Sequence, residues 1–288
     1  MNRSFAAAAV VLAVSSFAGD FDPSMAEAFS TRSRLLSDLY GAEKVIYQGE
    51  TEFLEYPLSD FQVAMLNGEE LMLLRNTIFS IHGYSFSDSS LLEHFQEFAW
   101  YSPESEDVAQ LLTDIDLYNL DLIAVYEDAG RAESEESPGS EDMAGFWHGS
   151  PHVAAGYSKR YLLYPDGRFA YRTNQMDGSR RLLEFSGSWS LEGGFLVLRA
   201  DSMEYLEGGT VVAPYASYGS DYVIENGEVE LRELDPPAVM RLPITGFSLY
   251  SDAGGMEDVP VPQVMIGSGK FWRIFSGETM PDQERSGG

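Results

Sequence analysis

The spacing of apolar residues changes near residue 145, and this change limits the fold more than any other feature of the chain. Before residue 130, apolar residues recur at spacings of three and four, which is typical of amphipathic helices. From Gly145 onwards, apolar and polar residues alternate, which is typical of strands with one buried face. The sequence therefore predicts an α+β protein of two domains, helical first and antiparallel β second.

The predicted β domain, residues 145–277, contains three dipeptides that favour tight turns. They are Asp166-Gly167, Gly193-Gly194 and Asn226-Gly227, and each stands between two strand-like runs. These residue types reach the positive backbone angles that two-residue hairpins require. The pattern predicts three β-hairpins within an antiparallel barrel or sandwich.

The predicted helical domain, residues 57–129, has clear helix start and stop signals. Ser59 and Asn67 are each followed three residues later by Gln or Glu, which is the capping-box pattern. Gly83 follows the first apolar stripe and is a natural left-handed stop. We expect three helices, the first ending at Gly83, the second spanning 89–98 and the third running from about 105 to 127.

The remaining segments are assigned from composition. Residues 19–56 are expected to be a lead-in segment with one weak helix and a short strand pair. Residues 130–144 are predicted to be an acidic linker between two separate cores, because they include a Pro-Gly pair and few large apolar residues. Residues 278–288 are expected to be a flexible tail.

Residues 1–18 have the pattern of a secretory signal peptide. Arg3 precedes a short apolar run, and Ser16-Phe17-Ala18 offers small residues at the cleavage site. The run is short for a membrane span, so we expect no transmembrane anchor, although an uncleaved anchor helix is the alternative. The prediction is a secreted or periplasmic protein, and the sequence does not choose between these two locations.

The charge and the lack of cysteine exclude several classes of function. The formal net charge is −28 and the chain has no Cys. A strongly negative surface repels nucleic acid, and a chain without Cys forms no disulfide, thiolate metal site or Cys nucleophile. The acidity suits either a cationic partner or a saline habitat.

Spaced positions in the helical part resemble the YARHG domain, a bacterial extracytoplasmic domain of no established activity. The positions that carry the resemblance are Arg75, Asn76, Phe79, His82, Gly83, Trp100, Tyr101, Asn119 and Glu127. The resemblance implies a compact helical domain outside the cytoplasm and implies no reaction. The arginine in the name of the motif is Ile81 here, so any anion-binding role of that arginine would be absent.

The β part is similar, more loosely, to lipocalin-like barrels. Gly145-Phe146-Trp147 has the Gly-x-Trp form, and Trp189 lies in a later strand-like run. The resemblance makes Trp147 and Trp189 candidate ligand-facing residues if the barrel is hollow. The alternative is that alternating aromatic residues fill the interior.

Arg75 is the one Lys or Arg between residues 51 and 130, a segment with sixteen Asp and Glu residues. On a helix, Arg75 shares a face with Leu71 and points towards the core. A guanidinium in that position requires a carboxylate, so we predict a buried or half-buried pair with Glu127 or Asp116. Two amides are expected to support the pair: Asn76 and Asn119.

Other motif residues are given structural roles. His82 is expected to cap the carbonyls at the end of its helix before the Gly83 turn. Trp100 and Tyr101 are expected to close a small helical core, with an exposed aromatic patch for a glycan or peptide as the alternative.

The sequence contains no recognisable catalytic constellation, phosphate-binding loop or metal-ligand spacing, so we predict no catalytic residues, no cofactor and no metal. The leading interpretation is a non-enzymatic cell-envelope binding protein, with an envelope component or a protein as its partner. One alternative is a small-ligand carrier that uses a barrel cavity, and a less favoured one is an envelope-polymer hydrolase with paired carboxylates. The ligand and the oligomeric state stay open.

Overall fold

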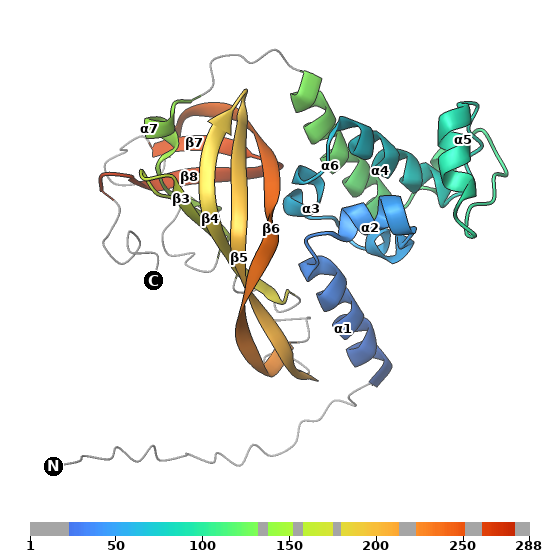
Figure 1. Cartoon of the computed structure of the whole chain (residues 1–288), viewed down its shortest axis with the longest axis horizontal. Helices are drawn as coiled ribbons and strands as arrows, with labels where there is room; N and C mark the ends of the chain where they lie inside the picture. The colour runs from blue at the N-terminus through green and yellow to red at the C-terminus, as the bar shows by residue number, and fades with distance from the viewer. Residues whose placement is uncertain are drawn as a thin grey trace.

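The computed structural model describes residues 23–131, 138–151, 158–174, 180–212, 223–250 and 261–279. A group of helices lies on one side of a β-barrel (Figure 1). The predicted signal peptide, residues 132–137 of the predicted linker and residues 280–288 of the predicted tail lie outside the described residues.

The first part, called the helical unit below, contains six α-helices and two short 3-10 turns among the described residues. They are α1 (Pro23–Ser37), α2 (Gly41–Gln48), η1 (Thr51–Glu55), α3 (Asp60–Ala64), α4 (Gly68–Ser80), α5 (Ser89–Gln96), η2 (Ala109–Leu111) and α6 (Asp114–Arg131). A short helix, α7 (Ser140–Met143), leads into the barrel.

The second part is a closed antiparallel barrel in which each strand pairs with the next and β8 returns to β1. Its strands are β1 (Gly145–His148), β2 (Arg160–Leu163), β3 (Arg168–Arg172), β4 (Leu182–Glu192), β5 (Phe195–Val212), β6 (Val223–Tyr250), β7 (Val261–Ile266) and β8 (Gly269–Ser276). The predicted α+β fold class is confirmed, and the choice between barrel and sandwich is decided by closure of the ring.

Two of the three predicted hairpins are present. Asp166-Gly167 joins β2 to β3, and Gly193-Gly194 joins β4 to β5. Gly167, Gly193 and Gly194 all have positive φ angles, as tight turns require.

The third predicted hairpin, at Asn226-Gly227, is wrong. Asn226 does have a positive φ of 56°, but it lies inside β6, and the pairing with β5 continues on both sides of it. Gly208 and Gly209 on the facing strand also have positive φ angles. Because both strands bend at the same level, the ladder passes through the bend instead of ending there.

The third predicted helix begins nine residues later than expected, at Asp114 instead of about residue 105. The Thr113 backbone N–H donates to the Asp116 carboxylate, and the Asp116 N–H donates to the Thr113 hydroxyl, so a reciprocal cap fixes the start. Ser105 forms a bridge with Tyr84 instead of entering the helix.

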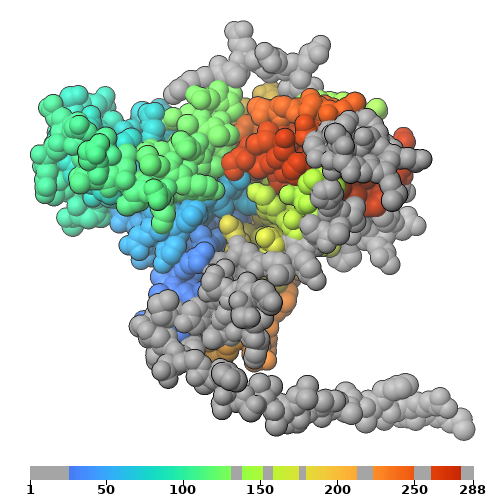
Figure 2. Space-filling model, turned by 180° about the vertical axis from the view of Figure 1, so that it is seen from behind, coloured from blue at the N-terminus to red at the C-terminus, as the bar shows by residue number. Residues whose placement is uncertain are grey.

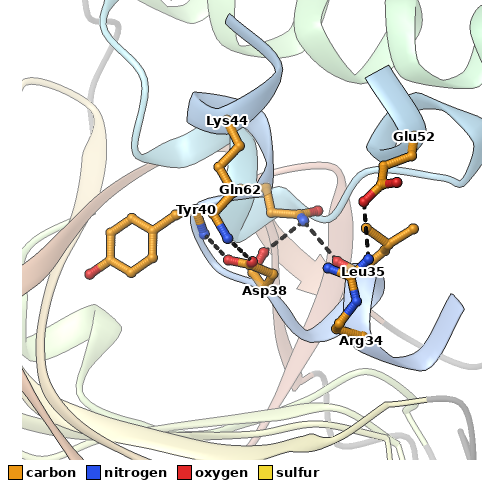
Figure 3. A network of polar contacts seen from close by, with 7 residues as sticks. All are labelled: Arg34, Leu35, Asp38, Tyr40, Lys44, Glu52 and Gln62. Carbon is orange, nitrogen blue, oxygen red and sulfur yellow. Dashed lines mark hydrogen bonds and ion pairs between the residues drawn. The ribbon is translucent and has the colours of Figure 1, made fainter. Parts of the chain in front are cut away.

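The predicted strand pair in the lead-in segment is also wrong, because this segment forms α2 and η1. A network of polar contacts holds the corner between α1 and α2 against α3 (Figure 3). The Gln62 side-chain amide of α3 donates to the carbonyls of Leu35 and Asp38. The Asp38 carboxylate in turn accepts from the Tyr40 backbone N–H and from the Lys44 ammonium. These contacts fix α3 in position.

The two parts share one hydrophobic interior, so the prediction of two separate cores joined by a tether is wrong. α3 lies between the barrel and the other helices (Figure 1), and the two parts form a continuous surface from behind (Figure 2). Phe61 of α3 packs edge-on against Tyr171 and Phe185 of the barrel, each with a ring-centroid separation of 4.5 Å. The buried cluster extends from Leu35 in α1 to Phe271 in β8.

Replacing Phe61 with Ala is expected to lower the free energy of unfolding by about 3–5 kcal/mol, because it removes a buried ring from the junction of both parts. Chemical denaturation with fluorescence detection measures the change. Leu231→Ala is the control, since that side chain is 72% exposed and its loss should cost less than about 0.5 kcal/mol. Equal effects of the two changes would contradict the role given to Phe61.

Candidate functional site

A hollow of about 600 Å³ lies between the helical unit and the barrel wall, and we call it the Arg75 groove. It is bounded by the start of α4, the end of α6 and the adjoining edges of β5 and β6. The lining residues are Leu66, Asn67, Gly68, Leu71, Met72, Arg75, Tyr126, Glu127, Gly130, Phe195 and Arg241. The volume falls within the range of small-molecule pockets.

Arg75 lies in this groove and forms the predicted carboxylate pair, with Glu127 as its partner. Arg75 Nη1 is 3.2 Å from Glu127 Oε2, and the pair joins α4 to α6. The Glu127 side chain is 8% exposed whereas that of Arg75 is 39% exposed. A guanidinium has five N–H donors, so Arg75 can hold Glu127 and still present donors to the groove.

A second cation lines the groove from the barrel side. Arg241 of β6 donates to Glu192 at 2.9 Å, and its guanidinium lies 5.1 Å from the centroid of the Phe195 ring. Arg241 and Phe195 reach the groove through the pairing of β5 with β6, and nothing in their local sequence marks them as site residues.

The two amides predicted to support Arg75 have other roles. Asn76 donates to the Met72 carbonyl of its own helix, because the next residue along a helix points about 100° away from Arg75. Asn119 is fully buried, where it accepts from the Leu58 N–H and donates to the Tyr56 carbonyl. Asn119 therefore fixes the segment that leads into α3.

His82 does not cap the end of α4 as predicted. Its Nε2 lies 2.9 Å from Asp116 Oδ2, so it joins the end of α4 to the start of α6. Backbone N–H groups fill the capping role instead, including that of Gly83, which donates to the Ser80 carbonyl. Gly83 has a φ of 80°, which confirms the predicted left-handed stop.

Aromatic side chains of α5 and its flanking loops pack mainly on one another, and we call them the α5 aromatic cluster. The cluster comprises Phe79, Tyr84, Phe86, Phe95, Phe98, Trp100 and Tyr101. Phe95 is fully buried and the other rings are half-buried. Trp100 donates to the Gly49 carbonyl and Tyr101 donates to the Tyr84 carbonyl. These contacts fit the predicted closing role better than an exposed patch.

Trp147 and Trp189, the candidate ligand-facing residues, lie in the packed interior. Trp147 is fully buried and its indole N–H donates to the Met143 carbonyl at 2.7 Å. Trp189 is 9% exposed and its indole N–H donates to the Tyr164 carbonyl at 2.9 Å. Neither residue lines the Arg75 groove.

Residues 44–128 match the family model of the YARHG domain. The helical unit therefore carries a YARHG domain. The match starts within α2, earlier than the predicted boundary at residue 57, in agreement with the helical structure found in the lead-in segment. The YARHG domain is typical of extracytoplasmic proteins. No curated protein and no solved structure matches the chain.

Two further observations concern the described residues alone. None of their helices is both long and apolar enough to cross a bilayer. No three of their His, Asp or Glu side chains come together in a group that could hold a metal ion.

Replacing Arg75 with Met is expected to lower the free energy of unfolding by about 1–3 kcal/mol, because the Glu127 carboxylate stays buried without its partner. Thermal and chemical unfolding measure the effect. Arg34→Met is a matched control, since Arg34 pairs with Glu52 at 3.0 Å with both side chains about half exposed, and its loss should cost less than about 1 kcal/mol. An unchanged stability of Arg75→Met would contradict the role of the pair.

His94 makes the stability of the α5 aromatic cluster dependent on pH. Its Nε2 is buried without a hydrogen-bond partner among the described residues, and its ring lies against Phe95 and Phe98. Burial lowers the pKa of His94, an effect that nearby Glu97 opposes. The unfolded chain therefore binds more protons at this site than the folded chain once the pH falls below about 6.5.

Stability is accordingly expected to fall as the pH drops through this window and to stop falling below the folded-state pKa of His94. In the His94→Phe variant this contribution is absent, so the variant should lose less stability than the unaltered protein between about pH 7 and pH 5. Urea denaturation at each pH measures the two slopes. Identical slopes would show that His94 has no such effect.

Proposed function

We propose that this chain is a non-enzymatic binding protein of the cell envelope, secreted or periplasmic, whose ligand occupies the Arg75 groove. The observation that carries the proposal is a hollow of about 600 Å³ with walls from both parts of the protein and two arginines among its lining residues. The ligand class is a molecule with an apolar body and one anionic group.

The chemistry of the lining supports this ligand class. Leu66, Leu71 and Met72 supply an apolar wall from the helical unit, and Phe195 supplies one from the barrel. Among the described lining residues the charged ones are Arg75, Arg241 and Glu127, and each arginine is held by a carboxylate: Arg75 by Glu127 and Arg241 by Glu192. A guanidinium has five N–H donors, so both arginines keep donors for an anionic group. Apolar walls with a few fixed charged groups are typical of small-molecule sites.

The proposal also holds that the protein catalyses no reaction. The His82 ring bonds to the Asp116 carboxylate and the His148 ring bonds to the Ser150 backbone carbonyl, so neither of these bonds joins a histidine directly to a hydroxyl nucleophile. The hydrolase alternative requires two facing carboxylates, whereas Glu127 is the one carboxylate among the described residues that line the groove, and it is paired with Arg75. The carrier alternative places a ligand within the barrel, where the ring of Phe61 already packs against Tyr171.

Native mass spectrometry of the protein isolated from its own envelope tests the proposal. An added β-carbon at Gly68 meets no atom within 4 Å, so Gly68→Trp should fill the groove without disturbing the backbone. We expect a bound small molecule on the unaltered protein and at least about tenfold lower occupancy on Gly68→Trp. Leu117→Trp is the matched control on an exposed part of α6 outside the groove and should keep the bound molecule.

The proposal fails if the unaltered protein carries no bound molecule. It also fails if the same molecule stays on Gly68→Trp, because the binding site would then lie elsewhere.

A further inference from the structure

A second hollow, of about 240 Å³, lies at the end of the barrel that α3 covers, and we call it the barrel mouth. Its residues come from helices and strands that are far apart in sequence. They are Leu58, Ser59, Asp60, Phe61, Tyr118, Lys159, Tyr161, Tyr171, Thr173, Asn174, Arg180 and Ser268. It is distinct from the Arg75 groove, because no described residue lines both hollows.

Two largely buried tyrosine side chains, Tyr161 and Tyr171, line the barrel mouth. Tyr161 is 2% exposed and Tyr171 is 5% exposed, and neither hydroxyl has a hydrogen-bond partner among the described residues. Both side chains line the hollow, where a bound molecule could accept from them.

Asp60 defines one side of the barrel mouth and its acceptor sites are largely occupied. Oδ1 accepts from the Ser268 N–H at 2.6 Å and from the Tyr126 hydroxyl at 2.9 Å, while Oδ2 accepts from the Ser268 hydroxyl at 2.9 Å. Gly267 permits this contact, because a β-carbon there would collide with the Asp60 carboxylate. Asp60 therefore offers little to a ligand and serves to hold α3 on the barrel.

The other polar groups of the barrel mouth are mainly donors. The Lys159 ammonium lies 5.4 Å from the centroid of the Phe271 ring and has no carboxylate partner among the described residues. Arg180 adds a second positive charge and lines the same hollow. The Thr173 hydroxyl already donates to a backbone carbonyl at 3.0 Å. Among the described lining residues, the hollow thus combines two cations and two phenol hydroxyls with one carboxylate, Asp60, which is already held by Ser268 and Tyr126.

The phenol rings of Tyr161 and Tyr171 lie against each other, with a ring-centroid separation of 4.7 Å. Burial raises the pKa of Tyr161 well above its ordinary value, and Tyr171 and Asp60 raise it further. Burial also raises the pKa of Tyr171, where Arg180 acts in the opposite direction. Both phenols therefore stay protonated at neutral pH and act as donors.

We propose that the barrel mouth binds a small oxyanion, a carboxylate or a phosphate, through Lys159, Arg180 and the hydroxyls of Tyr161 and Tyr171. An oxyanion is the ligand class that accepts several hydrogen bonds and offsets positive charge at once. At about 30 Å³ for each water molecule displaced, a hollow of about 240 Å³ holds a ligand of no more than about eight non-hydrogen atoms.

Isothermal titration calorimetry of the full chain tests the proposal with sodium malonate, sodium phosphate and, at the same ionic strength, sodium chloride. We expect saturable binding of malonate or phosphate and none of chloride. Whichever of the two binds more tightly shows whether the natural ligand carries a carboxylate or a phosphate. If neither binds saturably, the proposal is wrong.

Substitutions of the proposed ligand-binding residues test where the oxyanion binds. The double variant Tyr161→Phe/Tyr171→Phe keeps both rings and should weaken binding at least about tenfold, as should Lys159→Met. Tyr47→Phe removes an exposed hydroxyl elsewhere and should leave affinity unchanged. Gly68→Trp should also leave it unchanged, so failure of the groove proposal and failure of this one remain distinguishable. Unaltered affinity in both mouth variants would overturn the assignment.

A measurement on the unaltered protein covers the case in which the variants do not fold. The chain has three lysines, so their acetylation rates can be followed separately by mass spectrometry. The oxyanion should slow acetylation of Lys159 at least about threefold and leave that of exposed Lys270 unchanged. Equal slowing of both lysines, or of neither, would contradict binding at the barrel mouth.

Discussion

The insertion of Phe61 into the mouth side of the barrel is the interaction on which the rest of the structure depends. It joins two kinds of secondary structure into one buried cluster, with ring-centroid separations of 4.5 Å to Tyr171 and Phe185. Gln62 on the same short helix binds the α1–α2 corner, and Asp60 binds Ser268 on the barrel. Three consecutive residues of α3, Asp60, Phe61 and Gln62, therefore connect the other helices to the barrel.

Both hollows follow from this docking. A helix that rests on the end of a curved barrel cannot fill the space at its flanks, so one hollow forms beside α4 and α6 and another forms beneath α3. The chain places some of its few cations at these positions: Arg75 and Arg241 line the first hollow, and Lys159 and Arg180 line the second. Both hollows therefore offer cationic donors in a protein whose net charge is −28.

The YARHG domain thus acts within a larger unit. Its Arg75–Glu127 pair joins α4 to α6, while Asn119 and His82 fix the segments on either side of that pair. Phe195 and Arg241, the groove residues that the barrel supplies, lie outside residues 44–128, so the domain alone would present an incomplete site.

Local sequence determined the elements, whereas the tertiary structure decided how they are used. The caps at Ser59 and Asn67 and the Asp166-Gly167 turn were predictable, because each depends on residues within about four positions of one another. Helix periodicity places Arg75 on the core-facing side of its helix, and for this reason the sequence narrowed its partner to two carboxylates, Glu127 and Asp116. Asn226 was misread, because its effect depends on glycines of the facing strand. Phe61 and Lys159 each contact residues more than 100 positions away in the sequence, Tyr171 and Phe271. These contacts depend on how the helices dock on the barrel and on the register of its strands, and no local sequence pattern encodes either.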